Sequence, residues 1–364
     1  MTAESFFAHD YAGARDKFLS AHRQVGARIE NFKNPTAGPN AETLATDVAW
    51  IGPDDAENVL LTISGTHGAE GFCGSGVQVG WIETGLYKEM PENTALMQVH
   101  AINPHGFAWL RRVTEDNVDL NRNFIDHGLG DYPRNEGYEE LAEAICPPEW
   151  TDAVVAECDR ILEAYAEKHG LRALQAAVSS GQYSHADGIF YGGRAPTWSR
   201  TALEKILQDY LGKARRIGII DYHTGLGPRG YGERICVHIP GEGGLERAAE
   251  WYDGDITSPV QGTSASVPLH GVNLLGIEKL LSHAQTTAVA LEYGTIDTRD
   301  VKYALRADNW LHAHGQHEMG TAKGKEIKRR IRDAFYQDAA DWKDMIWERA
   351  VETQRKALAG MSES

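Results

Sequence analysis

The stretch that most constrains the fold is residues 59–76, VLLTISGTHGAEGFCGSG, because an apolar strand runs directly into a glycine-rich turn. Leu60, Leu61 and Ile63 form the short apolar run that is typical of a strand buried on both faces in a parallel sheet. The glycines that follow allow the backbone to turn sharply and to approach a bound group closely. The stretch therefore predicts a parallel strand whose end carries a turn suited to binding.

This turn carries His67 and Glu70, three residues apart. Both side chains can point at one centre, and zinc accepts neutral imidazole nitrogen and carboxylate oxygen as ligands. The alternative is an ordinary polar pair near a surface turn, because an isolated match of this kind has a high false-positive rate. Two ligands do not hold a catalytic zinc, so the prediction requires a third from elsewhere in the chain.

Two more polar residues stand at the ends of predicted strands. His223 follows a strand predicted over residues 216–222, and Glu292 ends an apolar strand predicted over residues 286–293. Ligands bind at the carboxyl ends of the strands in open α/β sheets, so these residues can meet although they are far apart in sequence. With His223 as third ligand, a fourth zinc position stays open for water, as a hydrolytic zinc requires. Glu292 can then act as general base, the alternative being a salt bridge with an arginine.

Arg111, Arg112 and Arg122 lie close together in a long polar loop over residues 103–124 of an otherwise acidic chain. Guanidinium groups are suited to forked contact with a carboxylate or with a polarised carbonyl oxygen. The alternative is ordinary ion pairing with the acidic residues of the same loop. One of these, Asp119, can also accept a hydrogen bond from a metal-bound histidine.

Strand and helix signals alternate along the chain, which indicates an α/β fold with a parallel sheet. Strands are predicted over residues 46–51, 59–63, 95–102, 216–222, 234–239 and 286–293, and helices over residues 12–32, 76–86 and 245–251. The turn-rich segment GPDDAEN predicts a hairpin between the first two strands. We predict a mixed, mostly parallel twisted sheet flanked by helices on both faces.

The chain is expected to form a single catalytic domain over residues 1–364. Residues 126–198 are predicted to be an inserted segment of helices and loops, and residues 298–364 a charged helical extension. The insert contains the unusual loop GQYSHADGIFYGG, and long polar-aromatic loops in compact domains are usually functional. We expect the insert to cover the site as a lid, with side chains of this loop facing the substrate: Tyr183, His185, Asp187 and Tyr191.

The charge balance excludes some classes of partner. With 52 acidic and 36 basic residues, the formal net charge is −16, so most of the surface would repel nucleic acid or an anionic membrane. The four cysteines are scattered without a CxxC pair and are expected to be reduced thiols. Neither a signal peptide nor an apolar run of transmembrane length is evident. We expect a cytoplasmic protein.

Four short motifs then occur in a fixed order: HGAE at residues 67–70, DLNRNF at 119–124, DYH at 221–223 and ALEYGT at 290–295. Together they resemble the motif set of the zinc carboxypeptidase superfamily, which also contains succinylglutamate desuccinylase and aspartoacylase. The whole chain most resembles a bacterial branch of that superfamily. It departs from a classical carboxypeptidase in the much longer segment between DLNRNF and DYH.

The resemblance implies one zinc per chain, bound by His67, Glu70 and His223, with Asp119 supporting a histidine. It also implies that Asn121 and Arg122 hold a substrate carboxylate, that Arg112 or Arg111 polarises the scissile carbonyl, and that Glu292 activates the water. The substrate-side tyrosine of the family is not identified by position, and the candidates are Tyr191, Tyr231 and Tyr293.

Function follows from this set of residues. The sequence predicts a zinc-dependent amide hydrolase, first of all a carboxypeptidase-like enzyme acting on small peptides with a free C-terminal carboxylate. The alternative is an N-acyl amino acid deacylase like succinylglutamate desuccinylase or aspartoacylase. A zinc-containing small-molecule binding protein is the non-enzyme alternative, but a pure binder needs no base beside the metal.

Overall fold

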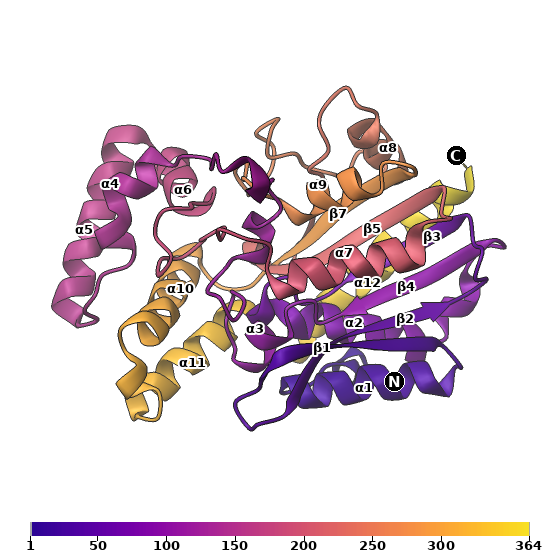
Figure 1. The fold of residues 1–364 in the computed structure, drawn as a ribbon, viewed down its shortest axis with the longest axis horizontal. Coiled ribbons are helices and arrows are strands. Elements are labelled where there is room, and N and C mark those ends of the chain that lie inside the picture. The colour runs from indigo at the N-terminus through magenta and orange to yellow at the C-terminus, as the bar shows by residue number, and fades with distance from the viewer. Residues whose placement is uncertain (1, 364) are drawn as a thin grey trace.

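Seven strands form one sheet in the computed structural model, which describes residues 2–363 (Figure 1). The strands are β1 (Arg28–Ala37), β2 (Thr43–Ile51), β3 (Asn58–Ile63), β4 (Thr94–His100), β5 (Arg216–Arg229), β6 (Gly232–Ile235) and β7 (Gln285–Gly294). Their order is β1-β2-β4-β3-β5-β7-β6, and the four neighbours β4, β3, β5 and β7 are parallel. The remaining pairs, at the two edges, are antiparallel, so the predicted mixed, mostly parallel sheet is confirmed.

The central strands are buried on both faces, as their apolar runs predict. Successive side chains of β3 point to opposite faces, so Leu60 packs in one hydrophobic core while Val59 and Leu61 pack in another. The first face is covered by α1 (Tyr11–Gln24), α2 (Gly71–Glu83), α3 (Pro104–Ala108), α8 (Gly244–Trp251) and α12 (Ala340–Glu363). The second face is covered by α7 (Trp198–Leu211) and α9 (Asn273–Leu280). The sheet is therefore the middle layer of three.

A lobe of helices stands beside the end of the sheet, at the left of Figure 1. It consists of α4 (Glu136–Ile145), α5 (Asp152–His169) and α6 (Leu171–Ser179) from the insert, with α10 (Thr298–Ala313) and α11 (Ala322–Phe335) from the tail. A hydrophobic cluster joins the two groups, with Leu141 and Val178 on one side and Leu305 and Ile331 on the other. Short 3₁₀ helices complete the structure: η1 (Ala3–Phe6), η2 (Gly68–Glu70), η3 (Leu86–Glu89), η4 (Leu120–Arg122), η5 (His127–Leu129) and η6 (Gln316–Glu318).

Two predictions near the N-terminus are wrong. The helix predicted over residues 12–32 ends at Gln24, and residues 28–37 form the edge strand β1. Pro35 lies in that strand, where the missing N–H is tolerated because the strand is at an edge and a register shift occurs between Lys33 and Ala37. The predicted hairpin between β2 and β3 does not form because β4 lies between them. Turn residues set where a chain reverses, but not which strand lies beside which.

Two further features concern the chain as a whole. Among the helices of residues 2–363, none has a stretch long and apolar enough to cross a bilayer. The four cysteines, Cys73, Cys146, Cys158 and Cys236, are free thiols, as the sequence predicts.

Candidate metal centre

The turn after β3 brings His67 and Glu70 to the carboxyl end of the sheet. Gly65 adopts a left-handed backbone (φ +72°) just after the strand, and His67 precedes η2, whose last residue is Glu70. Gly68 packs directly on the backbone of α3, since a β-carbon there would lie 1.9 Å from the carbonyl carbon of Gly106. The glycines of this turn are therefore required by close backbone contact.

His223 and Glu292 come from the neighbouring strands β5 and β7. They are direct register partners in the parallel pair, and β3 lies on the other side of β5, with Ile63 opposite Asp221. The ends of three parallel strands thus deliver the residues that the sequence placed there, as the topology of an open α/β sheet requires.

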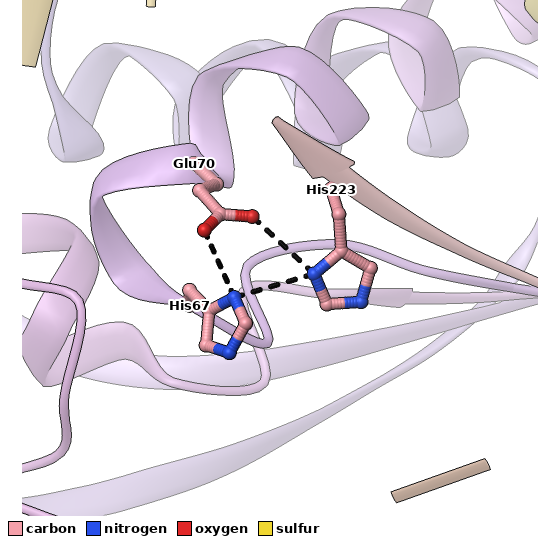
Figure 2. A group of neighbouring side chains, drawn as sticks. All are labelled: His67, Glu70 and His223. Atoms are coloured by element: carbon pink, nitrogen blue, oxygen red, sulfur yellow. Dashed lines mark hydrogen bonds and ion pairs between the residues drawn. The ribbon is translucent and has the colours of Figure 1, made fainter. Parts of the chain in front are cut away.

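His67, Glu70 and His223 face one another at the centre of this site (Figure 2). Nδ1 of His67 lies 2.9 Å from Oε1 of Glu70 and 3.3 Å from Nδ1 of His223, and Nδ1 of His223 lies 3.3 Å from Oε2 of Glu70. Ligand atoms about 2.0–2.1 Å from one tetrahedral zinc are about 3.4 Å apart, so this spacing fits such an ion with little adjustment. All three side chains are buried.

Each of the two histidines has a carboxylate next to its Nε2 atom. Oδ1 of Asp119 lies 3.1 Å from Nε2 of His67, which Nη2 of Arg112 also approaches to 2.8 Å, and Oδ2 of Asp221 lies 2.8 Å from Nε2 of His223. These hydrogen bonds leave Nδ1 of both rings free to bind a metal, which is the usual arrangement around ligating histidines. Burial by itself would raise the pKa of Asp119, but the charges of Arg112, Arg122 and His67 lower it well below its usual range.

Asp221 is held by more than its histidine. Its carboxylate also accepts hydrogen bonds from Oγ1 of Thr66 (2.9 Å) and from Nδ2 of Asn273 (2.6 Å). Burial alone would lower the pKa of His223, but the carboxylates of Asp221 and Glu70 raise it well above its ordinary value. The pocket therefore concentrates negative charge around its histidines, which favours a bound cation.

Glu292 lies in the same cavity without a counter-ion. It is buried, forms no ion pair with any residue in 2–363, and accepts one hydrogen bond through Oε1 from the backbone N–H of Leu226 (3.0 Å). Burial and the nearby charge of Glu70 raise the pKa of Glu292 to about 8. The salt bridge considered as its alternative role is absent from this part of the chain.

Of the two adjacent arginines, Arg112 reaches the site and Arg111 does not. Arg112 donates to Oδ2 of Asp119 (2.9 Å) and to Oε1 of Glu70 (3.1 Å), and it lines the cavity. Arg111 is buried beside Asp308, with Nε 3.5 Å from the carboxylate, and is not part of the cavity wall. The predicted substrate role of Arg111 thus has no support in its position, because its guanidinium is committed to a buried ion pair.

Asn121 and Arg122 also line the cavity. Arg122 is buried, and its guanidinium donates to the carbonyl oxygens of Ser179 (2.6 Å) and Asn121 (2.8 Å). Burial lowers the pKa of Arg122 to about 10. The amide oxygen of Asn121 accepts from the backbone N–H of Asn273 (3.0 Å). Both side chains are therefore oriented by the protein before any substrate binds.

The predicted aromatic contacts of the insert are only partly met. Tyr191 accepts a backbone hydrogen bond from Asp119 (2.8 Å), and Tyr183 donates its hydroxyl to the carbonyl oxygen of Arg122 (2.6 Å), so the loop packs on the DLNRNF segment. However, none of the four predicted loop residues lines the cavity, and neither does any tyrosine among the described residues.

Phe190 is the loop residue that does reach the cavity. Its ring centre lies 5.0 Å from the guanidinium carbon of Arg112 and 5.4 Å from that of Arg122. Its backbone is left-handed (φ +55°), which is strained for a bulky residue and typical of functional sites. The insert also contributes Gln175, Val178 and Ser179 to the wall, so it borders the site through other residues than those predicted.

The cavity has a volume of about 180 Å³ and two kinds of wall. The metal-site residues, Glu292 and the arginines line one side. The other side is apolar and is formed by residues of β6, β7, α9 and the connecting loops: Ile235, Val237, Val267, Leu269, Val272, Leu274, Leu275 and Ala290.

Sequence reasoning missed three residues that shape this site. Asp221 stands two residues before His223 in DYH, and an acidic residue buried in a strand is itself a signal of a polar partner. Thr224 donates its backbone N–H to Oε2 of Glu70 (3.0 Å), and no side-chain pattern predicts such a contact. Phe190 could be suspected only from the composition of its loop.

A family model described as a protein of unknown function (DUF2817) matches residues 7–349. No curated protein sequence matches the chain significantly.

Three solved structures illustrate what the chain is similar to. Carboxypeptidase A from Helicoverpa armigera is 11% identical with a TM-score of 0.47, over 90% of this chain and 74% of that one. Succinylglutamate desuccinylase from Chromobacterium violaceum is 14% identical with a TM-score of 0.38, over 87% and 72%. An aspartoacylase family protein from Mesorhizobium loti is 13% identical with a TM-score of 0.37, over 79% and 67%.

Proposed function

This chain belongs to the DUF2817 family of proteins of unknown function, and we propose from its own site that it is a zinc-dependent amide hydrolase. One observation carries the proposal. Three buried side chains with the donor atoms and spacing of a zinc site, His67, Glu70 and His223, share a cavity with the unpaired carboxylate of Glu292. A zinc ion held there would polarise a carbonyl oxygen and make water acidic enough to react near neutral pH.

Glu292 is assigned as the general base and then the general acid. The backbone N–H of Leu226 holds one carboxylate oxygen, which leaves the other free to take a proton from the attacking water. The same oxygen then passes the proton to the nitrogen of the leaving amine. A carboxylate is suited to both steps, since it can accept a proton from water and then donate it to an amine nitrogen.

Arg112 is assigned to the carbonyl oxygen of the scissile amide. Its side chain is fixed by Asp119 and Glu70 and lies against the ring of Phe190, so its guanidinium is placed before the substrate arrives. Positioned donors of this kind stabilise the charge that develops on oxygen during amide cleavage. We assign this role to Arg112 rather than Arg111 because only Arg112 lines the cavity.

The leaving group is proposed to be an amino acid with a free carboxylate. Three N–H bonds of Arg122 are used by carbonyl oxygens, and a guanidinium has five, so two remain for a ligand. With the amide nitrogen of Asn121, they form a site suited to a carboxylate. The apolar wall formed by Val267, Leu269 and Leu274 supports an apolar side chain on that amino acid.

A carboxypeptidase and an N-acyl amino acid deacylase share this chemistry and differ on the acyl side of the carbonyl. The motifs favour a short peptide as substrate. The deacylase is the second candidate because the insert contributes Gln175 and Val178 from α6 and Phe190 from its loop to the cavity wall, which supports a closed acyl side. The binding-protein alternative is disfavoured by Glu292, whose unpaired burial would serve no purpose in a pure binder.

Two measurements test the proposal. Metal analysis of the purified protein should find about one zinc per chain, and the zinc content should be reduced in His67→Ala and in His223→Ala. Full metal content in both variants would refute the site.

A panel of short peptides and N-acyl amino acids, each with and without C-terminal amidation, should show cleavage of the free acids only. Glu292→Gln should keep its zinc and lose about 10²–10⁴-fold in turnover. Equal cleavage of amidated substrates would refute the carboxylate site at Arg122.

A further inference from the structure

A second and larger cavity, of about 660 Å³, adjoins the metal-site cavity. It lies between α5 and α6 of the insert and α10 of the tail, in the lobe at the left of Figure 1. This volume is within the range of small-molecule sites, whereas the first cavity is small for a whole substrate.

The two cavities share a wall that includes a neighbour of Glu292, Leu226, and a neighbour of the arginines, Phe190. The residues that line both are Gln175, Val178, Phe190, Leu226, Thr298, Lys302 and Leu305. Leu226 among them is the residue whose N–H holds Glu292, whereas Asn121 and Arg122 line only the first cavity. With the carboxylate of the leaving amino acid at Arg122, the acyl part of the substrate has room to extend past the shared wall into the second cavity.

The walls of the second cavity suit a hydrocarbon chain better than a peptide. Its apolar lining comes from three helices and the insert loop: Leu162, Ala166, Leu171, Leu174, Ile189, Tyr303 and Leu305. The backbone groups of helices bond to one another, so these walls offer few partners for the amides of a peptide, and a buried amide without a partner is unfavourable. A chain of methylene groups has no such requirement.

Seven charged residues line this cavity; four of them form two ion pairs, and Arg172, Asp300 and Lys302 form none within residues 2–363. Arg299 lies 3.3 Å from Glu163, and Arg306 lies 2.5 Å from Asp159. Burial lowers the pKa of Lys302. A lysine can lay its methylene stem along an apolar surface, and burial disfavours the charged form of its amino group, so Lys302 is compatible with an apolar occupant. Because the amino group of Lys302 could pair with an anion, the alternative occupant of this cavity is an acyl group that ends in a carboxylate.

Two of the large apolar side chains most exposed to solvent belong to the walls of these cavities. Leu171, at the start of α6, is 79% exposed and lines the second cavity, and Val260 is 62% exposed and lines the first. Apolar side chains that gather where a cavity meets solvent are typical of sites for apolar ligands. Leu171 and Val260 thus continue the apolar lining of the two cavities to the solvent-exposed surface.

We propose that the second cavity is the acyl subsite of this enzyme and that it receives a long, unbranched hydrocarbon chain. The substrate class is then an N-acyl amino acid with a fatty acyl group and an apolar amino acid, oriented with its carboxylate at Arg122. This inference rests on the proposed hydrolase function in its deacylase form, which also gives the orientation of the substrate. The chemical nature of the acyl group is inferred from the wall that the two cavities share and from the apolar lining of the second cavity.

The test is a chain-length series on the zinc-loaded full-length protein, with N-acetyl-, N-octanoyl- and N-dodecanoyl-leucine. Each methylene that becomes buried strengthens binding by up to about fourfold, so kcat/KM should rise by about 100-fold or more from acetyl to dodecanoyl. Affinity for the same three compounds is measured separately by calorimetry on Glu292→Gln, which needs no turnover.

Two variants of α5 test whether the dependence of kcat/KM on acyl chain length arises in the second cavity. Ala166→Trp on α5 places a large ring in the second cavity, whereas Ala164→Trp on the same helix is exposed and outside both cavities. We expect Ala166→Trp to lower kcat/KM for the dodecanoyl substrate by about tenfold or more, and to leave the acetyl substrate and the zinc content unchanged. Ala164→Trp should change none of these values.

The outcomes separate the two proposals. Equal kcat/KM for all chain lengths would overturn the acyl subsite and leave the hydrolase proposal intact. Tighter binding of longer chains without any hydrolysis would support the subsite and overturn the proposed function. Faster cleavage of a tripeptide ending in leucine, or a preference for a glutaryl group that is lost in Lys302→Met, would overturn the hydrocarbon chain as occupant.

Discussion

Replacing Asp221 by asparagine should weaken zinc binding without unfolding the protein. The carboxylate of Asp221 is fully buried and accepts from three donors: Nε2 of His223 at 2.8 Å, Oγ1 of Thr66 at 2.9 Å and Nδ2 of Asn273 at 2.6 Å. Asparagine keeps one acceptor oxygen but turns the other into a donor, which then faces at least one of these donor groups. The negative charge that holds the imidazole in its metal-binding tautomer is lost as well.

The size of the expected loss in zinc affinity follows from the hydrogen bonds that Asp221→Asn removes. Loss of one hydrogen bond to a charged group costs about 1.5–3 kcal/mol, which corresponds to a factor of roughly 10–150 in an equilibrium constant. Substitutions behind a metal-bound histidine usually reduce metal affinity by about 10–100-fold, in agreement with that estimate. We therefore expect the zinc dissociation constant of Asp221→Asn to rise by about 10–100-fold.

The assay is competition for zinc with a chromophoric chelator at pH 7, with the folded fraction checked by circular dichroism. The control is Asp47→Asn, because Asp47 is equally buried and is bonded to Arg15 (2.7 Å), in β2 and outside the metal-site cavity. It should lower stability and leave zinc affinity within about twofold. Equal zinc affinity in Asp221→Asn and the wild type, or an equal loss in both variants, would refute the reasoning.

Three further perturbations probe other parts of the argument. Arg112→Lys keeps the charge but not the forked donor, so kcat should fall by about 10²–10³-fold at unchanged zinc content; unchanged kcat would remove Arg112 from the reaction. Gly68→Ala forces a β-carbon onto the backbone of Gly106 and should cost about 1–3 kcal/mol of unfolding free energy, whereas Gly320→Ala, with open space around it, should cost far less in the same urea titration. Burial lowers the pKa of His100 to about 3, so the unfolded chain, with a histidine pKa near 6.5, takes up the proton first and stability falls as the pH drops below 6.5. The loss is about 2 kcal/mol at pH 5, and His100→Leu should remove that much of the pH dependence; an unchanged slope would contradict this.

The metal ligands could be predicted because their positions depend on local patterns and on one general property of parallel sheets. An apolar run followed by polar residues marks the end of a buried strand, and parallel neighbouring strands end on the same edge. His67, Glu70 and His223 therefore converge whatever the detailed packing is. Glu292 converges for the same reason, as the register partner of His223.

The choice between adjacent residues could not be made in this way. Arg111 and Arg112 are equivalent in sequence, and the burial of Asp308 in α10, almost 200 positions further along, decides that Arg111 turns away. Phe190 rather than Tyr191 reaches the cavity because of how its loop packs on DLNRNF. In the same way, β4 separates β2 from β3 although nothing in the connecting turn indicates it.

The sequence by itself thus determined the class of fold, the three candidate metal ligands and the position of the proposed base, since these follow from short-range periodicity and from the geometry of strand ends. Only the tertiary structure decided which arginine faces the substrate, which carboxylate supports His223, and that the insert and α10 enclose a second cavity. Those features arise from contacts between segments far apart in the chain. Their free energies depend on the shape of both partners, and one segment's residue pattern carries no information about the shape of the other.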